Sequence, residues 1–225
     1  MVFSNMRQSM SSDSQAMQPV HPANAIGLEP DVQAIEERLK GWTQPEDLIA
    51  FYGSSSLRLW SSMEQDLAPL NVINLGFGGA SYDYCVHYFD RIFKDLTPSQ
   101  IVLYCGDNDV AQDQTPEQVM GYLRHLLAQI AARYGDIKVS AVSVKPSPIR
   151  APLMPVARQL NEMIKAEMAG RANREFIDIV GHFLDDQGMP DRSFYLDDML
   201  HFNAKGYQTW ARQFGLALGQ PQTSA

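Results

Sequence analysis

The chain has 225 residues, of which 45% are hydrophobic and 20% are charged, and its net charge is 18 − 26 = −8 at pH 7. This length fits one α/β domain with tails better than two complete domains, and the composition is that of an ordinary soluble globular protein. The acidic balance disfavours a nucleic-acid partner, since no basic stripe offers phosphate contacts, and no apolar run reaches the roughly 18 residues of a membrane-spanning helix.

The two ends of the chain show no hydrophobic period. Residues 1–28 are rich in Ser, Gln, Met, Pro and Asn and predict a disordered N-terminal tail, and residues 220–225 predict a short C-terminal tail. The first residues contain no apolar run of the kind that a secretory signal needs, so we expect a cytoplasmic protein, with export from a differently placed start left open. Residues 29–219 are expected to form a single domain, and the oligomeric state is left open.

The cysteine and histidine content favours neither disulfides nor a metal site. Cys85 and Cys105 stand in apolar surroundings and are typical of buried free thiols in a reducing compartment. The five histidines are scattered along the chain, whereas zinc ligands are closely spaced. We therefore expect no metal and no cofactor.

Short apolar runs alternate with helical patterns from about residue 30 onward. Five predicted strands, each bounded by glycine, proline or polar residues, cover 47–52, 71–75, 100–104, 137–144 and 175–180. Predicted helices cover 81–95, 115–134, 152–169 and 204–218, the last of them capped by Asn203. Trp42, Trp60 and Trp210 are on or near amphipathic helices and are expected to pack. The alternation predicts a parallel sheet covered by helices on both faces.

Polar segments follow the predicted strands, where open parallel sheets bind their ligands. These segments are Gly53–Ser56, Gly76–Ser81, Gly106–Asp109 and, late in the chain, 197–203. Each alone has an ordinary interpretation as a turn or a helix cap, and the first is also compatible with a phosphate cradle. The glycines after the second strand are not a dinucleotide fingerprint, because G-x-G-x-x-G fails at Ser81.

Together, the four segments contain the groups that acyl transfer needs. A serine hydroxyl becomes a nucleophile when an imidazole takes its proton, and the imidazole needs a carboxylate on its other nitrogen. Asp198 is three residues before His201 and can reach back to that ring within one turn. The tetrahedral oxyanion needs donors fixed in advance, and a glycine N–H, a serine N–H at a helix start and an Asn amide are available at the strand ends.

In this order and with these spacings, the segments resemble the SGNH hydrolases, also called the GDSL esterase/lipase family. The matching blocks are Phe51–Ser56, Asn74–Gly79, Gly106–Asp109 and Asp198–His201, and the resemblance covers about residues 47–215. The resulting expectation for the fold is a three-layer α/β/α sandwich with five parallel strands in the flavodoxin-like order 2-1-3-4-5.

The resemblance also implies roles for individual residues. Ser55 corresponds to the nucleophile, and Asp198 and His201 complete a Ser-His-Asp triad. The oxyanion hole would consist of the N–H groups of Ser55 and Gly79 and the side-chain amide of Asn108.

The first block departs from the family pattern at one position. Ser54 stands where the family usually has Asp, which puts the support of the loop in doubt and leaves Ser54 and Ser56 as rivals of Ser55 for the role of nucleophile. The alternative candidates for the acid, should Asp198 not serve, are Asp197, Asp107 and Asp109.

The favoured function is a serine esterase that hydrolyses a small carboxylic ester, acetyl or short acyl, through a covalent acyl-enzyme. The resemblance implies acetylated carbohydrates, lysophospholipids, thioesters or simple aryl esters as candidate substrates. Lys145 and Arg150 follow the fourth strand and are expected either to line the substrate rim or to belong to a solvated loop. Two alternatives stay open: a flavodoxin-like module that binds phosphate or flavin at Gly53–Ser56, and a non-catalytic member of the same family.

Overall fold

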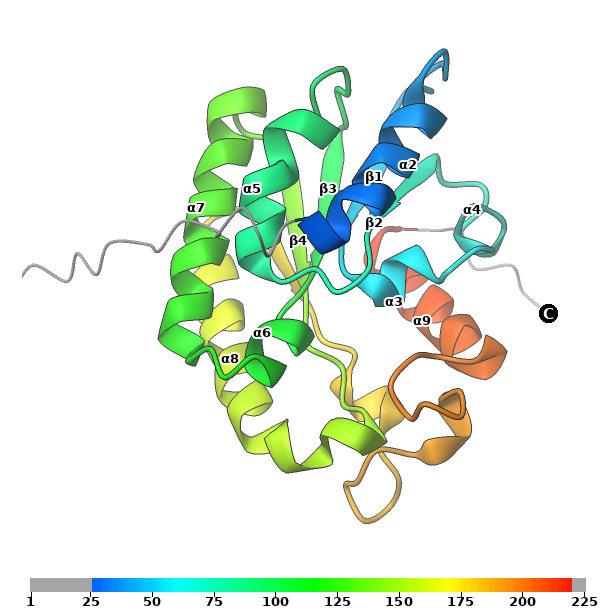
Figure 1. The fold of residues 1–225 in the computed structure, drawn as a ribbon, viewed down its shortest axis with the longest axis vertical. Helices are drawn as coiled ribbons and strands as arrows, with labels where there is room; N and C mark the ends of the chain where they lie inside the picture. The colour runs from blue at the N-terminus through cyan, green and yellow to red at the C-terminus, as the bar shows by residue number, and fades with distance from the viewer. Residues whose placement is uncertain (1–25, 220–225) are drawn as a thin grey trace, which may run out of the picture.

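The computed structural model describes residues 26–219 (Figure 1). The tails expected at residues 1–28 and 220–225 lie outside this range, except that Ile26–Leu28 form a short 3₁₀ helix, η1. Among the described residues, no helix is long and apolar enough to cross a membrane.

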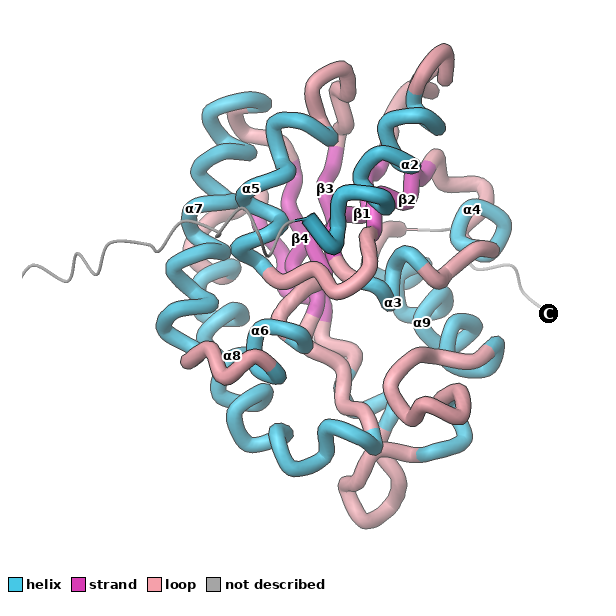
Figure 2. The backbone as a smooth tube through the Cα atoms, viewed as in Figure 1, coloured by secondary structure: helices cyan, strands magenta, loops and turns pink. Residues whose placement is uncertain are grey.

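Five parallel strands form the sheet in the order β2-β1-β3-β4-β5, which confirms the expected topology (Figure 2). In chain order they are Ile49–Gly53 (β1), Val72–Gly76 (β2), Gln100–Tyr104 (β3), Lys138–Val142 (β4) and Arg174–Ile177 (β5). All five predicted strands are therefore present, and they differ from the predicted ranges only at their ends.

Helices cover both faces of the sheet, so the three-layer sandwich is confirmed (Figure 1). One layer contains Glu29–Leu39 (α2), Tyr82–Ile92 (α5), Pro116–Tyr134 (α7) and Met154–Met168 (α8). The other contains Ser55–Arg58 (α3), Met63–Asp66 (α4) and Ala204–Ala217 (α9). Shorter elements follow the strands at one edge, namely Asp107–Ala111 (α6) and the 3₁₀ helices Pro148–Leu153 (η2), Val180–Phe183 (η3) and Arg192–Phe194 (η4).

The central strand β1 shows why these apolar runs form a doubly covered sheet. Successive side chains of a strand point to opposite faces. Ala50 and Tyr52 join the core beneath α2, α5, α7 and α8, whereas Ile49 and Phe51 join the core beneath α9. All five residues of β1 are buried, which explains a continuous apolar run in place of an alternating one.

Most of the tryptophan and cysteine predictions are confirmed. Trp60 and Trp210 stack in the core beneath α9, with ring centroids 5.5 Å apart. Cys85 and Cys105 are buried free thiols whose Sγ atoms are 3.3 Å apart. The prediction for Trp42 is wrong, because this residue lies just after the end of α2 and is 37% exposed.

The strand register places the functional segments together. Gly53, at the end of β1, is level with Gly76 of β2 and Tyr104 of β3. The loops that follow these three strands therefore leave the sheet at the same edge, near the helices α3 and α6 (Figure 1). The candidate site is built at this edge.

Candidate active site

The chain turns sharply between β1 and α3, and glycine makes this turn possible. Gly53 has φ +151°, and a Cβ atom there would lie 1.9 Å from the carbonyl oxygen of Tyr104 on the neighbouring strand. The N–H of Ser54 donates to that same carbonyl at 3.0 Å. Ser55 is then the first residue of α3, where helical N–H groups have no partner within the helix.

Ser55, His201 and Asp198 form a continuous series of contacts. The distance from Ser55 Oγ to His201 Nε2 is 2.9 Å, and the distance from His201 Nδ1 to Asp198 Oδ2 is 2.6 Å. A carboxylate only accepts hydrogen bonds, so Nδ1 carries a proton, and in the neutral form of the ring Nε2 then accepts from the Ser55 hydroxyl. The three side chains of the expected triad are therefore in contact. Ser55 comes from the turn between β1 and α3, and Asp198 and His201 come from the turn before α9.

The turn that contains His201 is stabilised by the carboxylate of Asp198, which belongs to the same turn. Asp198 Oδ1 accepts from the backbone N–H groups of Leu200 and His201 at 2.9 and 3.0 Å. Burial opposes ionisation of Asp198, but these bonds and the bond from the His201 ring outweigh it and lower the pKa of Asp198 to about 2. Met199, in the middle of the turn, has φ +56°, a conformation that a side chain disfavours and that the surrounding bonds must maintain.

The rival serines differ from Ser55 in accessibility and in their contacts. Ser54 and Ser56 are each 2% exposed, whereas Ser55 is half-buried and is the serine that contacts His201. The departure from the family pattern at Ser54 leaves the turn intact, because the backbone of this residue makes the bond to Tyr104.

The rival acids are engaged elsewhere or exposed. Asp107 pairs with Arg150, with 2.6 Å between Oδ1 and Nη1. Asp109 is fully buried and accepts from the N–H groups of Tyr82 and Gly106 at 2.8 and 2.9 Å, and burial raises its pKa to about 7 despite these bonds. Asp197 is exposed. Asp198 is the acid in contact with the imidazole.

The amide of Asn108 has a defined orientation. Its Nδ2 donates to the Ala80 carbonyl at 2.9 Å, and its Oδ1 accepts from Arg150 Nη2 at 3.0 Å. Because the guanidinium only donates, it fixes which end of the amide is oxygen. One N–H of Nδ2 bonds to the Ala80 carbonyl, and the second has no acceptor among residues 26–219.

The glycine loop after β2 is held by residues that the sequence patterns do not reveal as site residues. The N–H of Gly78 donates to Asp31 Oδ2 at 2.7 Å, and Arg58 Nε lies 3.3 Å from the same oxygen. Gly79, next in the chain, has φ +72° and is exposed. Asp31 is recognisable in the sequence only as an acid near a helix N-terminus, which gives no indication of this contact.

One of the two expectations for Lys145 and Arg150, a solvated loop, is wrong, because neither residue is exposed. Lys145 is 2% exposed, and its Nζ donates to the carbonyl of Leu200 at 2.6 Å. Burial lowers the pKa of Lys145, and the neighbouring Asp107 opposes this shift. Arg150 is half-buried and binds Asn108, as described above. Val144 and Pro146, on either side of Lys145, are buried as well. Lys145 and Arg150 both line a small pocket beside Asp107, and their role at the substrate rim stays a prediction.

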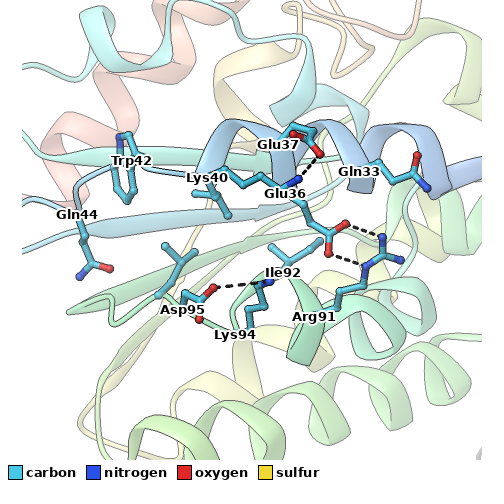
Figure 3. Close-up of a pocket in the computed structure, with 12 residues that line it drawn as sticks. Gln33, Glu36, Glu37, Lys40, Trp42, Gln44, Arg91, Ile92, Lys94 and Asp95 are labelled. Atoms are coloured by element: carbon cyan, nitrogen blue, oxygen red, sulfur yellow. Dashed lines mark hydrogen bonds and ion pairs between the residues drawn. The ribbon is translucent and has the colours of Figure 1, made fainter.

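A separate pocket of about 350 Å³ lies between α2 and α5, towards the opposite edge of the sheet (Figure 3). Trp42 stands at one end of it, and Arg91 pairs with Glu36 at 2.6 Å at the other. Among its lining residues in the described chain, none is a serine, cysteine or histidine. Within residues 26–219, no three His, Cys, Asp or Glu side chains are grouped so that they could hold a metal ion.

Comparisons with known proteins identify the family of this chain. The family model of the GDSL-like Lipase/Acylhydrolase family matches residues 41–209. The alpha1 subunit of human (Homo sapiens) platelet-activating factor acetylhydrolase IB is 27% identical over 173 residues, which are 73% of this chain and 71% of that protein.

Solved structures show the same fold. A GDSL-like lipase from Bacteroides thetaiotaomicron superposes with a TM-score of 0.69 at 20% identity, covering 84% of this chain and 97% of the other. An acetyl-xylooligosaccharide esterase from Geobacillus Stearmophilus gives a TM-score of 0.65 at 15% identity, covering 80% and 97%. With a family match over most of the described residues, the chain belongs to the GDSL-like lipase/acylhydrolase family and is a hydrolase acting on ester bonds.

Proposed function

We propose that the protein is a serine esterase that hydrolyses a small carboxylic ester, acetyl or short acyl, through a covalent acyl-enzyme on Ser55. The observation that carries this proposal is the series of contacts from Ser55 Oγ through the His201 ring to Asp198, at 2.9 and 2.6 Å. A nucleophile within reach of a base, and a base oriented by a third group, is the arrangement that activates a hydroxyl.

In the acylation step, Ser55 Oγ attacks the ester carbonyl carbon while His201 Nε2 takes the hydroxyl proton. The carbonyl oxygen becomes an oxyanion that accepts from the N–H groups of Ser55 and Gly79 and from the Asn108 amide. His201 then gives the proton to the alkoxide, the C–O bond breaks and the alcohol leaves. A water molecule attacks the acyl-enzyme by the same route, with His201 as base, and releases the acid and free Ser55.

The short-acyl preference is supported by the names of two similar proteins. The human relative is named for platelet-activating factor acetyl hydrolysis, and the Geobacillus neighbour is named as an acetyl-xylooligosaccharide esterase. Both names specify an acetyl group, although the two alcohols differ entirely. We therefore propose that the acyl group of the substrate is acetyl or another short chain. A panel of esters with different alcohols would identify the alcohol part.

The binding-module alternative fits the geometry less well. A phosphate or flavin cradle at Gly53–Ser56 gives no role to the contact between Ser55 and His201, nor to Asp198. The non-catalytic alternative was raised by Ser54, and the turn that this residue occupies is formed by backbone bonds. Neither alternative explains why an acid and an imidazole are aligned on a half-buried serine.

The function is tested with the purified protein, p-nitrophenyl acetate, butyrate and octanoate, and a fluorophosphonate probe. We expect turnover that is fastest with the acetyl or butyryl ester and a single label on Ser55. Absence of both turnover and labelling in a folded protein would contradict the proposal. A visible absorption band of a bound flavin would support the binding module in its place.

Replacing Asn108 by Ala tests the oxyanion hole. Removal of one donor that acts on the developing oxyanion is expected to lower kcat by about 10²–10³-fold with a smaller change in KM. Steady-state kinetics with the preferred aryl ester measure both constants. A change confined to KM would assign Asn108 to ground-state binding of the substrate.

A further inference from the structure

Lys145 is a buried lysine beside the site, in the loop that follows β4. Its side chain has no exposed surface. Moving an ammonium group out of water is costly, and partners in the interior must offset that cost. The partners of Lys145 therefore indicate what the group does.

The Lys145 ammonium contacts the two segments that carry the proposed base and the proposed oxyanion donor. Its Nζ donates to the Leu200 carbonyl at 2.6 Å and lies 3.7 Å from Asp107 Oδ2. Leu200 immediately precedes His201, and Asp107 immediately precedes Asn108. One cation thus joins the neighbours of two residues that acyl transfer needs.

Two aromatic rings complete the surroundings of the ammonium. Its Nζ lies 5.6 Å from the ring centroid of Tyr195 and 5.3 Å from that of Phe202, within the range of cation–π attraction. These two residues are paired across the base of the turn that contains His201. The other charged groups that act on Lys145 are Arg150 and Asp198.

The loop after β4 also contacts this turn through its backbone. The hydroxyl of Tyr195 donates to the Pro146 carbonyl, and the N–H of Ile149 donates to the Met199 carbonyl at 3.2 Å. These bonds surround the one that Lys145 makes. These contacts attach the turn that carries His201 to the loop after β4, in addition to the bonds that Asp198 makes within the turn.

We propose that Lys145 is a positioning residue for the reaction: its ammonium holds the Leu200 carbonyl, and with it His201, at the distance from which the ring reaches Ser55. Through Asp107 the same group keeps the Asn108 loop in register with that ring. The inference rests on the proposed function. In this role Lys145 acts through the two segments that it joins, by its contacts with Leu200 and Asp107.

The central variant is Lys145→Met, which keeps the length of the side chain and removes both the charge and the donors. Because a displacement of about 1 Å in a reacting group can cost about 10²-fold, we expect kcat to fall by about 10–100-fold with KM changed by less than about threefold. Lys145→Gln retains a donor for the Leu200 carbonyl and is expected to recover part of the loss. The rate of fluorophosphonate labelling should follow kcat.

The matched control is Lys138→Met, the same substitution at the opposite end of β4. Lys138 Nζ pairs with Glu175 at 3.1 Å, and its side chain is 45% exposed. We expect this variant to have the kcat of the parent chain. Thermal melting of all variants separates a loss of positioning from a loss of folded protein.

A spectroscopic readout reports the position of the ring without turnover. The proton on His201 Nδ1, bonded to Asp198, is expected to give a downfield proton NMR signal that disappears in a His201→Ala control. This signal should shift or broaden in Lys145→Met and stay unchanged in Lys138→Met. A lysine that only supports the fold would lower the melting temperature of the folded variant and leave this signal in place.

The proposal is overturned if folded Lys145→Met has the kcat of Lys138→Met, or if its downfield signal is that of the parent chain. If Lys145→Met does not fold, the same comparisons apply to Lys145→Gln. If neither variant folds, the ammonium serves folding and the proposal fails. A parent chain with no esterase activity and no labelling contradicts the proposed function instead, and the NMR comparison then still decides whether Lys145 positions the ring.

Discussion

Replacing Ser55 by Ala is expected to abolish fluorophosphonate labelling and to lower kcat by about 10⁵–10⁶-fold, the loss typical of removing the nucleophile of a serine hydrolase. The physical reason is that this hydroxyl is the one aligned with His201 Nε2, at 2.9 Å. Single-turnover and steady-state assays with an aryl ester measure the loss. Circular dichroism checks that the variant is folded.

The neighbouring serines provide matched controls for this substitution. Ser54→Ala and Ser56→Ala remove the same hydroxyl group one residue away, from side chains that are each 2% exposed. Ser54 precedes α3 without a side-chain capping bond, so its loss should not unravel the helix. Both controls should keep their labelling. If a folded Ser54→Ala variant loses it, the nucleophile has been assigned to the wrong serine.

The sheet was predictable because its strands are buried on both faces. A buried parallel strand is a short apolar run bounded by turn residues, and this signal is local in the sequence. Once five such runs alternate with helices, the carboxyl ends of the strands must meet at one edge. The strand ends were less predictable, because they depend on which groups receive the last backbone hydrogen bonds.

The end of β4 shows this limit. Apolar residues continue to Val144, so the pattern extends the strand to that residue. In the structure β4 ends at Val142, because the backbone N–H and carbonyl of Val144 bond to the side chain of Asn161 on α8, at 2.7 and 3.2 Å. The side chain of Asn161, 17 residues away, takes the hydrogen bonds of Val144 that a neighbouring strand would otherwise make. No pattern of apolar residues predicts this contact.

The same distinction applies to the site, where local contacts are predictable from the sequence and long-range contacts are not. The contact between Asp198 and His201 spans three residues and follows from their spacing. The contact between Ser55 and His201 spans 146 residues. The strand ends indicate that a serine and a histidine segment share one edge of the sheet, but the resemblance to a known family selects Ser55 among the three serines. The sequence pattern places Lys145 in the loop after the fourth strand but gives no sign of its burial, because its partner Leu200 is 55 residues away.

Replacing Asp198 by Asn is expected to lower kcat by up to about 10⁴-fold while the turn is retained. The amide oxygen can still accept from the N–H groups of Leu200 and His201, which Asp198 Oδ1 does in the structure. The amide nitrogen, however, faces His201 Nδ1 as a donor and favours the tautomer in which Nε2 carries the proton. An imidazole in that tautomer cannot accept from Ser55. Asp197→Asn, at the adjacent exposed residue, is the matched control and should retain activity.

The dependence of kcat/KM on pH separates the roles of the two residues. The pKa of Asp198 is lowered to about 2, so this carboxylate is ionised in assays from mildly acidic to neutral pH. Loss of activity on the acidic side should then reflect one proton, on the base, and a plot of log(kcat/KM) against pH should rise with a slope of one. A slope of two would mean that Asp198 titrates in the same range and that its bonds to the turn are weaker than the structure shows.

The double variant tests whether the pair acts as one unit. His201→Ala is expected to be at least as damaging as Asp198→Asn, because it removes the group through which the carboxylate acts on Ser55. With the imidazole absent, Asp198 has nothing to orient, so Asp198→Asn combined with His201→Ala should be little worse than His201→Ala alone. Residual kcat values, measured with labelling as a check on active enzyme, give the comparison. If the two losses multiply, the carboxylate acts independently of the ring, and the acid that orients His201 has to be sought at Asp107 or Asp109.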